Sequence, residues 1–187
     1  MSSAVSICSN ALQLLGADAI ASLTENTGRA KLCNSLYAPT RDRLLRSHPW
    51  TFARKRVLMN PTDEVPAFDW GKTYQLPDDM LRLIQVGLRG RMPRYEIEGR
   101  KLLTNEATLP LLYVFRNTDP LTYDAIFVDL LTASLCAQMA YPITKSASLA
   151  DAKLKEFQLL RMQAGAVNGQ EEDPEDLGSP TFVDVRG

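Results

Sequence analysis

The segment 121–141, LTYDAIFVDLLTASLCAQMAY, constrains the fold more than any other part of the chain, because apolar residues surround nearly the whole helical wheel. A helix without a clear polar face is stable when other elements cover it on every side. Thr118 or Asp119 can cap this helix, Pro120 suits its first turn, and Pro142 should stop it. The segment therefore predicts the central helix of a bundle.

Three further segments, 4–16, 29–48 and 146–169, have apolar residues at helical spacing. In the second of these, Pro39 should kink the helix, because proline removes one backbone hydrogen bond. Pro49 should end it, because the residue before a proline avoids the helical region. With the central segment, the pattern predicts four helices.

The middle third of the chain has short apolar bursts separated by the turn sequences LPDD, GLRGRMP, EGRK and TNEAT. This pattern is typical of a small antiparallel sheet, and YEIEGRKLLTN predicts a hairpin that turns on residues 98–100. We therefore predict a mainly α protein. Residues 1–59 and 119–169 form a four-helix bundle, and residues 60–118 form a small antiparallel β insertion between the second and third helices.

The last residues, 170–187, differ in composition from the rest. Between 171 and 187 there are six acids and one base. This composition predicts an extended, disordered acidic tail. Residues 181–185 nevertheless alternate like a strand and could add to a partner's sheet.

Composition and cysteine usage exclude several protein classes. The net charge of −1 and the pI of about 5.9 do not suit a polycation that wraps DNA. Cys8, Cys33 and Cys136 are odd in number and far apart, which predicts buried thiols rather than disulfides or a zinc site. The N-terminus lacks the basic region of a signal peptide, and no long apolar run predicts a membrane span.

Candidate catalytic residues are few. A single histidine, His48, cannot form a histidine-based metal site alone, and the sequence contains no HExxH, calcium-loop or P-loop motif. The adjacent carboxylates at 63–64 and 78–79 could perform acid–base chemistry in a hydrolase, but such pairs more often cap helices or stay solvated in turns. We predict no enzymatic activity, no cofactor and no metal.

The segment 46–56, RSHPWTFARKR, mixes basic and aromatic residues and has two interpretations. As a nucleic-acid-binding strip, it would combine phosphate contacts with base stacking. Alternatively, Trp50 and Phe52 lie in the core, and the bases stay in solvent or pair with a neighbour's acids. The spacing of Trp50 and Phe52 favours the second interpretation. Side chains two positions apart in an extended strand point the same way, so both aromatic rings would face the core.

Several segments together resemble the phage tail tubular protein A family, the head-to-tail adaptors (connectors) of short-tailed and related tailed bacteriophages. The resemblance covers most of the chain, from about Ala4 to Ala164. Its most specific part is the W-x-F-A element after a basic helix, followed by a Y-x-L-P-x-D turn. The segments are SNALQLLGADAIASL, AKLCNSLYAPTRDRLLRSHPWTFARKRVLM, YQLPDDMLRLIQV, YEIEGRKLLTNE and YVFRNTDPLTYDAIFVDLLTASLCAQMA.

The resemblance implies a non-enzymatic virion structural protein. Such a protein is made in the bacterial cytoplasm and forms a twelve-fold ring at the head–tail junction, without a membrane. The portal protein binds one side of the ring, the tail nozzle or next connector binds the other, and genomic DNA passes through without being read. The alternative function is a nucleic-acid-binding module that uses residues 46–56.

The resemblance also implies roles for three sets of residues, each of which is a prediction. The core and hinge anchors are Pro49, Trp50 and Phe52. The candidates for subunit or portal contacts are Arg46, Arg54, Lys55 and Arg56. The candidates for portal binding in the tail are Glu171, Glu172, Asp173, Thr181, Phe182, Val183 and Val185.

Overall fold

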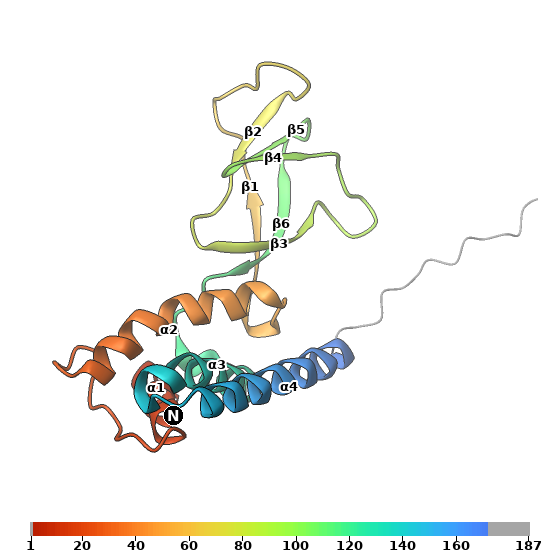
Figure 1. The fold of residues 1–187 in the computed structure, drawn as a ribbon. Coiled ribbons are helices and arrows are strands. Elements are labelled where there is room, and N and C mark those ends of the chain that lie inside the picture. The colour runs from red at the N-terminus through yellow and green to blue at the C-terminus, as the bar shows by residue number, and fades with distance from the viewer. Residues whose placement is uncertain (1, 172–187) are drawn as a thin grey trace, which may run out of the picture.

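A computed structural model describes residues 2–171 of the chain, with the side chains up to residue 164. A helical part and a strand-rich part lie at opposite ends of this region, and α2 lies between the strands and the other helices (Figure 1). The helices are α1 (Ala4–Gln13), α2 (Gly28–Ser47), α3 (Ala125–Thr144) and α4 (Ala147–Glu171).

Each of the first three helices begins at a residue whose side chain accepts a backbone hydrogen bond. Ser3 caps α1 in a capping box, Thr27 accepts from the N–H of Ala30, and Asp124 accepts from the N–H of Ile126. These bonds satisfy N–H groups that would otherwise lack partners at the first turn. The prediction that Thr118 or Asp119 caps the central helix is wrong: Asp119 caps a 3₁₀ turn at Pro120–Thr122, and α3 begins only after Asp124.

The apolar segment predicted to be central forms α3, which contacts α1, α2 and α4. Its mean hydropathy of 1.4 and its length would also suit a membrane span, by length and composition alone. Phe127, Leu131, Leu135 and Met139 are fully buried in the helical core. The apolar character of α3 therefore has an explanation within the packing of this chain.

The strands form two three-stranded antiparallel sheets, in the orders β1-β6-β3 and β2-β5-β4. The strands are β1 (Arg54–Met59), β2 (Lys72–Gln75), β3 (Met80–Val86), β4 (Glu96–Glu98), β5 (Lys101–Thr104) and β6 (Leu109–Phe115). Residues from both sheets form a second hydrophobic core. Its buried members are Met59, Tyr74, Leu76, Val86, Leu102, Leu109, Leu111 and Tyr113.

The predicted fold class, a four-helix bundle with one small β insertion and an extended acidic tail, is wrong. The described residues are 45% helical and 20% strand, the helices do not form a pure four-helix bundle, and the strands form two sheets. The two sheets can bury apolar faces together, so the strand-rich part has a core of its own. Of the predicted tail, Glu171 ends α4, and residues 172–187 lie outside the described region.

Local features show where the sequence patterns succeeded and failed. The hairpin turn at 98–100 is confirmed, because Glu98 pairs with Lys101 and Gly99 has a positive φ of 59°. Pro142 does not stop α3, which continues to Thr144. A proline in the last turn removes only one hydrogen bond, and that loss is small where the helix is about to end.

The chain passes from helix to sheet earlier than the boundary predicted at residue 60. Residues 51–53 form a short 3₁₀ turn rather than an extended strand, and β1 follows directly at Arg54. The segment 54–59, which was assigned to the helical bundle, pairs along its whole length with β6. The backbone N–H and C=O groups of a strand need hydrogen-bond partners, and β6 supplies them for β1.

Candidate functional site

The junction between the helical and strand-rich parts contains the predicted anchor residues. The backbone at His48 is extended, so α2 ends at Ser47 and Pro49 leads the chain into a turn. Trp50 then folds back onto the helix: its side chain is only 4% exposed, and Nε1 donates to the carbonyl oxygen of Leu44 at 3.1 Å. Trp50 therefore holds the start of the strand-rich part against the end of α2.

Four aromatic rings form a cluster at this junction, with Phe127 of α3 at its centre. The ring centroid of Phe127 lies 5.2 Å from Trp50, 5.1 Å from Phe52 and 5.0 Å from Tyr123. All three pairs have edge-to-face geometry, which is favourable for aromatic rings. Phe52 therefore contacts the core, as expected, although it does so from a 3₁₀ turn.

Three of the four basic residues predicted to form intersubunit contacts make polar contacts within the chain. Arg46 Nη1 donates to the carbonyl oxygen of Leu81 at 2.5 Å, and Arg54 Nε donates to that of Pro49 at 2.8 Å. Lys55 Nζ pairs with Asp79 Oδ2 at 2.8 Å. Arg56 is different, since its exposed side chain makes no hydrogen bond or ion pair with any residue that the structure describes.

Arginine side chains also link the sheet β1-β6-β3 to α2, and two of them were not predicted from the sequence. Arg82 of β3 donates to the carbonyl oxygen of Ser47 at 3.3 Å, and Arg116 Nε donates to Asp42 Oδ2 at 2.9 Å. Val114 of β6 is fully buried in the helical core. Polar and apolar contacts together therefore fix one sheet on the last turns of α2.

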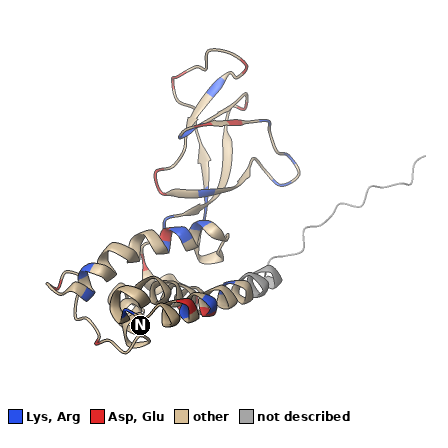
Figure 2. Cartoon of the chain, viewed as in Figure 1, with Lys and Arg blue, Asp and Glu red and all other residues tan. Residues whose placement is uncertain are grey.

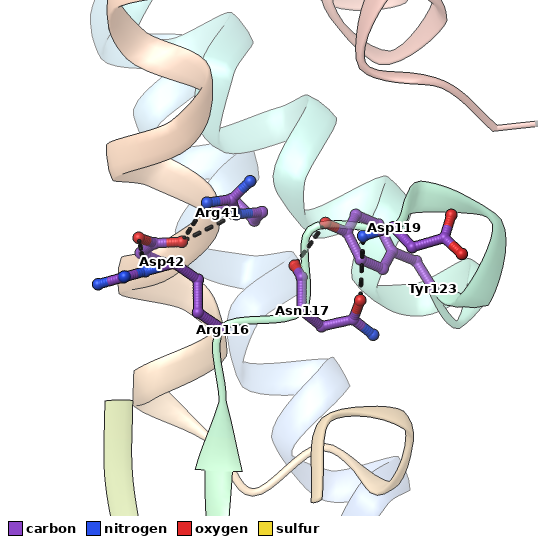
Figure 3. A network of polar contacts seen from close by, with 6 residues as sticks. All are labelled: Arg41, Asp42, Arg116, Asn117, Asp119 and Tyr123. Atoms are coloured by element: carbon purple, nitrogen blue, oxygen red, sulfur yellow. Dashed lines mark hydrogen bonds and ion pairs between the residues drawn. The ribbon is translucent and has the colours of Figure 1, made fainter. Parts of the chain in front are cut away.

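A buried ion pair lies beside these links (Figure 3). Arg41 is 7% exposed, and its Nη2 lies 2.7 Å from Asp42 Oδ1. The second carboxylate oxygen of Asp42 accepts from Arg116, so one carboxylate contacts two guanidinium groups. A buried charge needs such partners, because an unpaired one is very costly in a protein interior.

The segment between β6 and α3 is held by a second group of hydrogen bonds (Figure 3). The side-chain oxygen of Asn117 accepts from the N–H of Asp119 at 3.0 Å. The hydroxyl of Tyr123 donates to the carbonyl oxygen of Asn117 at 2.9 Å. Asn117 Nδ2 donates to Phe52 and Thr122, which connects this segment to the turn after Trp50.

Three of the four carboxylates considered for catalysis contact basic groups elsewhere in the strand-rich part. Asp79 contacts Lys55 and also accepts from the hydroxyl of Tyr113 at 3.0 Å. Glu64 pairs with Lys101 at 2.6 Å, and Asp78 lies 3.5 Å from Arg100. Bonds of this kind tie strands together, which is a structural role.

The pKa of Asp79 leads to a test of this role. Partial burial raises the pKa of its carboxyl group, but the hydrogen bonds from Lys55 and Tyr113 lower it more, so the pKa lies below its ordinary value. A group whose folded pKa is lowered stabilises the fold fully above its unfolded pKa, about 3.9 for Asp. This contribution is lost as the pH falls through the folded pKa.

We therefore expect Asp79→Asn to weaken the dependence of stability on acid pH. The urea midpoint of the native protein should fall more steeply between about pH 5 and pH 2 than that of the variant. Asp78→Asn is the matched control, because the Asp78 side chain is 100% exposed, and it should keep the native dependence. Equal slopes for the native protein and Asp79→Asn would contradict the assigned bonds.

The cysteines are buried and free, as the sequence predicted. Burial raises the pKa of the Cys33 and Cys136 thiols, which makes them poor nucleophiles. Among the described residues, no group of three or more His, Cys, Asp or Glu side chains could hold a metal ion.

Comparison with known proteins adds no relative. A scan against protein-family models and a search of curated proteins found no match to this chain.

Proposed function

We propose that this chain is a virion structural protein, a head-to-tail adaptor of a tailed bacteriophage. Twelve copies form a ring between the portal protein and the tail nozzle or next connector, and genomic DNA passes through the ring. The main support is the position of the W-x-F-A element. Trp50 and Phe52 join two parts of the chain that have separate cores, which suits a subunit that presents different surfaces to different neighbours.

Exposed apolar side chains on both parts of the chain also support an assembled protein. Large apolar residues that are more than half exposed occur on the sheets, on their loops and on α4. They include Leu58, Val65, Phe68, Leu88, Met92, Leu159 and Met162. Single exposed residues of this kind are ordinary, but clusters on a soluble chain often mark surfaces that a partner covers.

A nucleic-acid-binding module that uses residues 46–56 has less support. Base stacking requires an accessible aromatic face, and Trp50 is buried against Phe127. Arg46 and Lys55 already bond to groups within the chain, so contact with phosphates would first require those bonds to break. An enzymatic function has similarly little support, because Asp79 and Glu64 pair with lysines.

The proposal is tested by measuring the mass of the purified chain, alone and mixed with the portal protein encoded in the same genome. We expect a shift to the mass of a ring bound to the portal. A portal from an unrelated phage is the matched control and should cause no shift. A chain that stays monomeric with its portal, but shifts with short duplex DNA, would reject the adaptor and favour the nucleic-acid module.

A further inference from the structure

The outer face of the sheet β1-β6-β3 carries an apolar surface that the second core does not use. Across the three strands, Arg56 lies opposite Leu112 and Leu112 opposite Gln85, while Leu58 lies opposite Pro110. Side chains of directly opposed residues share one face of a sheet. Leu58 is 64% exposed, so this face is open in the isolated chain.

A groove of about 520 Å³ runs over this face. Its lining combines two arginines with apolar side chains from β1, from β6 and from the loop that follows β3. The residues that define it are Arg56, Leu58, Leu88, Arg89, Pro110 and Leu112. A smaller hollow of about 290 Å³, lined in part by Leu88 and Arg91, adjoins the groove. We call the two together the outer-face groove.

The loop between β3 and β4, which borders the outer-face groove, carries several basic residues (Figure 2). Within residues 88–94, three arginines occur without an acid: Arg89, Arg91 and Arg94. All three are exposed, and none makes an ion pair with any residue in the described part of the chain. Arg89 and Arg91 line the outer-face groove, whose smaller hollow also contains Glu106, whereas Arg94 lines a separate hollow. Arg46, Arg54 and Lys55 are bonded internally. The guanidinium groups of Arg56, Arg89 and Arg91 are instead available to a partner that enters the outer-face groove.

An occupant of this groove should carry both carboxylates and apolar side chains. The phosphate backbone of a nucleic acid would match the arginines, but it offers nothing to Leu58, Leu88 and Leu112. The residues beyond Glu171 match both features by sequence. Residues 172–187 include five acids and one base, with Leu177, Phe182, Val183 and Val185 among them. Charge complementarity and composition therefore favour this segment over nucleic acid.

We infer that residues 172–187 of one copy dock in the outer-face groove of a neighbouring copy. This inference rests on the proposed ring, in which one surface of each subunit must meet a different surface of the next. Phe182 lies 11 residues beyond the end of α4. At about 3.3–3.6 Å per extended residue, that length of chain spans up to roughly 36–40 Å, which suits a contact between subunits.

The inference is tested by photocross-linking in the full-length chain. Phe182 is replaced by p-benzoylphenylalanine, and ¹⁵N-labelled and unlabelled copies are mixed and assembled with the portal. Mass spectrometry then identifies which residues are joined and whether they come from copies with different labels. We expect cross-links between differently labelled copies, ending in residues 54–59, 85–91 or 108–112.

Charge reversal supplies a matched comparison. The double variant Arg56→Glu, Arg89→Glu should reduce the yield of these cross-links at least tenfold. Arg43→Glu should retain them, because Arg43 is an exposed arginine on α2, outside the groove. Equal yields in the double variant and the native chain would overturn the inference.

The remaining outcomes separate this inference from the proposed function. A ring of the expected mass whose cross-links end only in the portal, or only within single copies, would overturn the inference and leave the adaptor intact. Failure to assemble with the portal would reject both. If duplex DNA binds the native chain but not the double variant, while the cross-links persist unchanged, the groove's arginines serve nucleic acid instead.

Discussion

Trp50→Ala is expected to lower the free energy of unfolding by about 3–5 kcal/mol, the usual cost of truncating a buried aromatic side chain. The substitution removes the contacts with Phe127 and Phe52 and leaves a cavity where α2 meets the strands. It also removes the N–H donor to the carbonyl oxygen of Leu44. Equilibrium unfolding in urea, followed by circular dichroism, would measure the loss.

The matched control for this substitution is Trp70→Ala. Trp70 is only partly buried, and its Nε1 donates to Glu96 at an exposed position, at 3.1 Å. Removal of this ring should cost clearly less than removal of Trp50. If the two variants unfold at the same urea concentration, Trp50 does not anchor the junction.

Asp42→Ala is expected to lower the free energy of unfolding by about 2–3 kcal/mol. The substitution leaves the buried guanidinium of Arg41 without its carboxylate and frees Arg116 from α2. Breaking a buried ion pair typically costs about 3–5 kcal/mol. The expected loss is smaller here because the side chain of Asp42 is 27% exposed, so water partly screens the pair.

A second substitution distinguishes the cost of an unpaired charge from a simple loss of packing. Arg41→Met in the Asp42→Ala background removes the buried charge and should recover most of the lost stability. Asp18→Ala is the surface control, because the Asp18 side chain is 85% exposed, and its pair with Arg29 should contribute less than about 1 kcal/mol. If Arg41→Met does not raise the stability of Asp42→Ala, the unpaired charge of Arg41 does not cause the loss of stability.

Local sequence signals predicted the starts of α1 and α2, the hairpin at 98–100 and the burial of Trp50, because each depends on residues close in sequence. The apolar wheel of α3 also indicated its place among the other helices. Strand pairing was a different problem. β1 pairs with β6, 50 to 60 residues away in sequence, and a period-two pattern does not say which strands pair. The two-sheet arrangement therefore could not be read from the chain.

Only part of the junction can be predicted, because local chemistry determines some of its contacts and distant strands determine the others. Pro49 and Trp50 mark the end of α2 by local chemistry, but the partners of the basic residues come from distant strands. Lys55, which is predicted to contact a partner protein, also pairs with Asp79, and the link from Arg116 to Asp42 is not apparent from the sequence. Arg46, Lys55 and Arg56 are all exposed, and their role in contacts between subunits stays a prediction.

The strand-rich part leaves and rejoins the helical part at neighbouring positions, since Arg54 at the start of β1 pairs with Val114 near the end of β6. Opposed residues in an antiparallel pair have Cα atoms only about 4.5–5.5 Å apart. A short turn could close this gap without moving α2 or α3. The residues between Arg54 and Val114 could therefore be exchanged during evolution while the helices keep their packing. Such an exchange would change the surface offered to a neighbouring protein and leave the helical core intact.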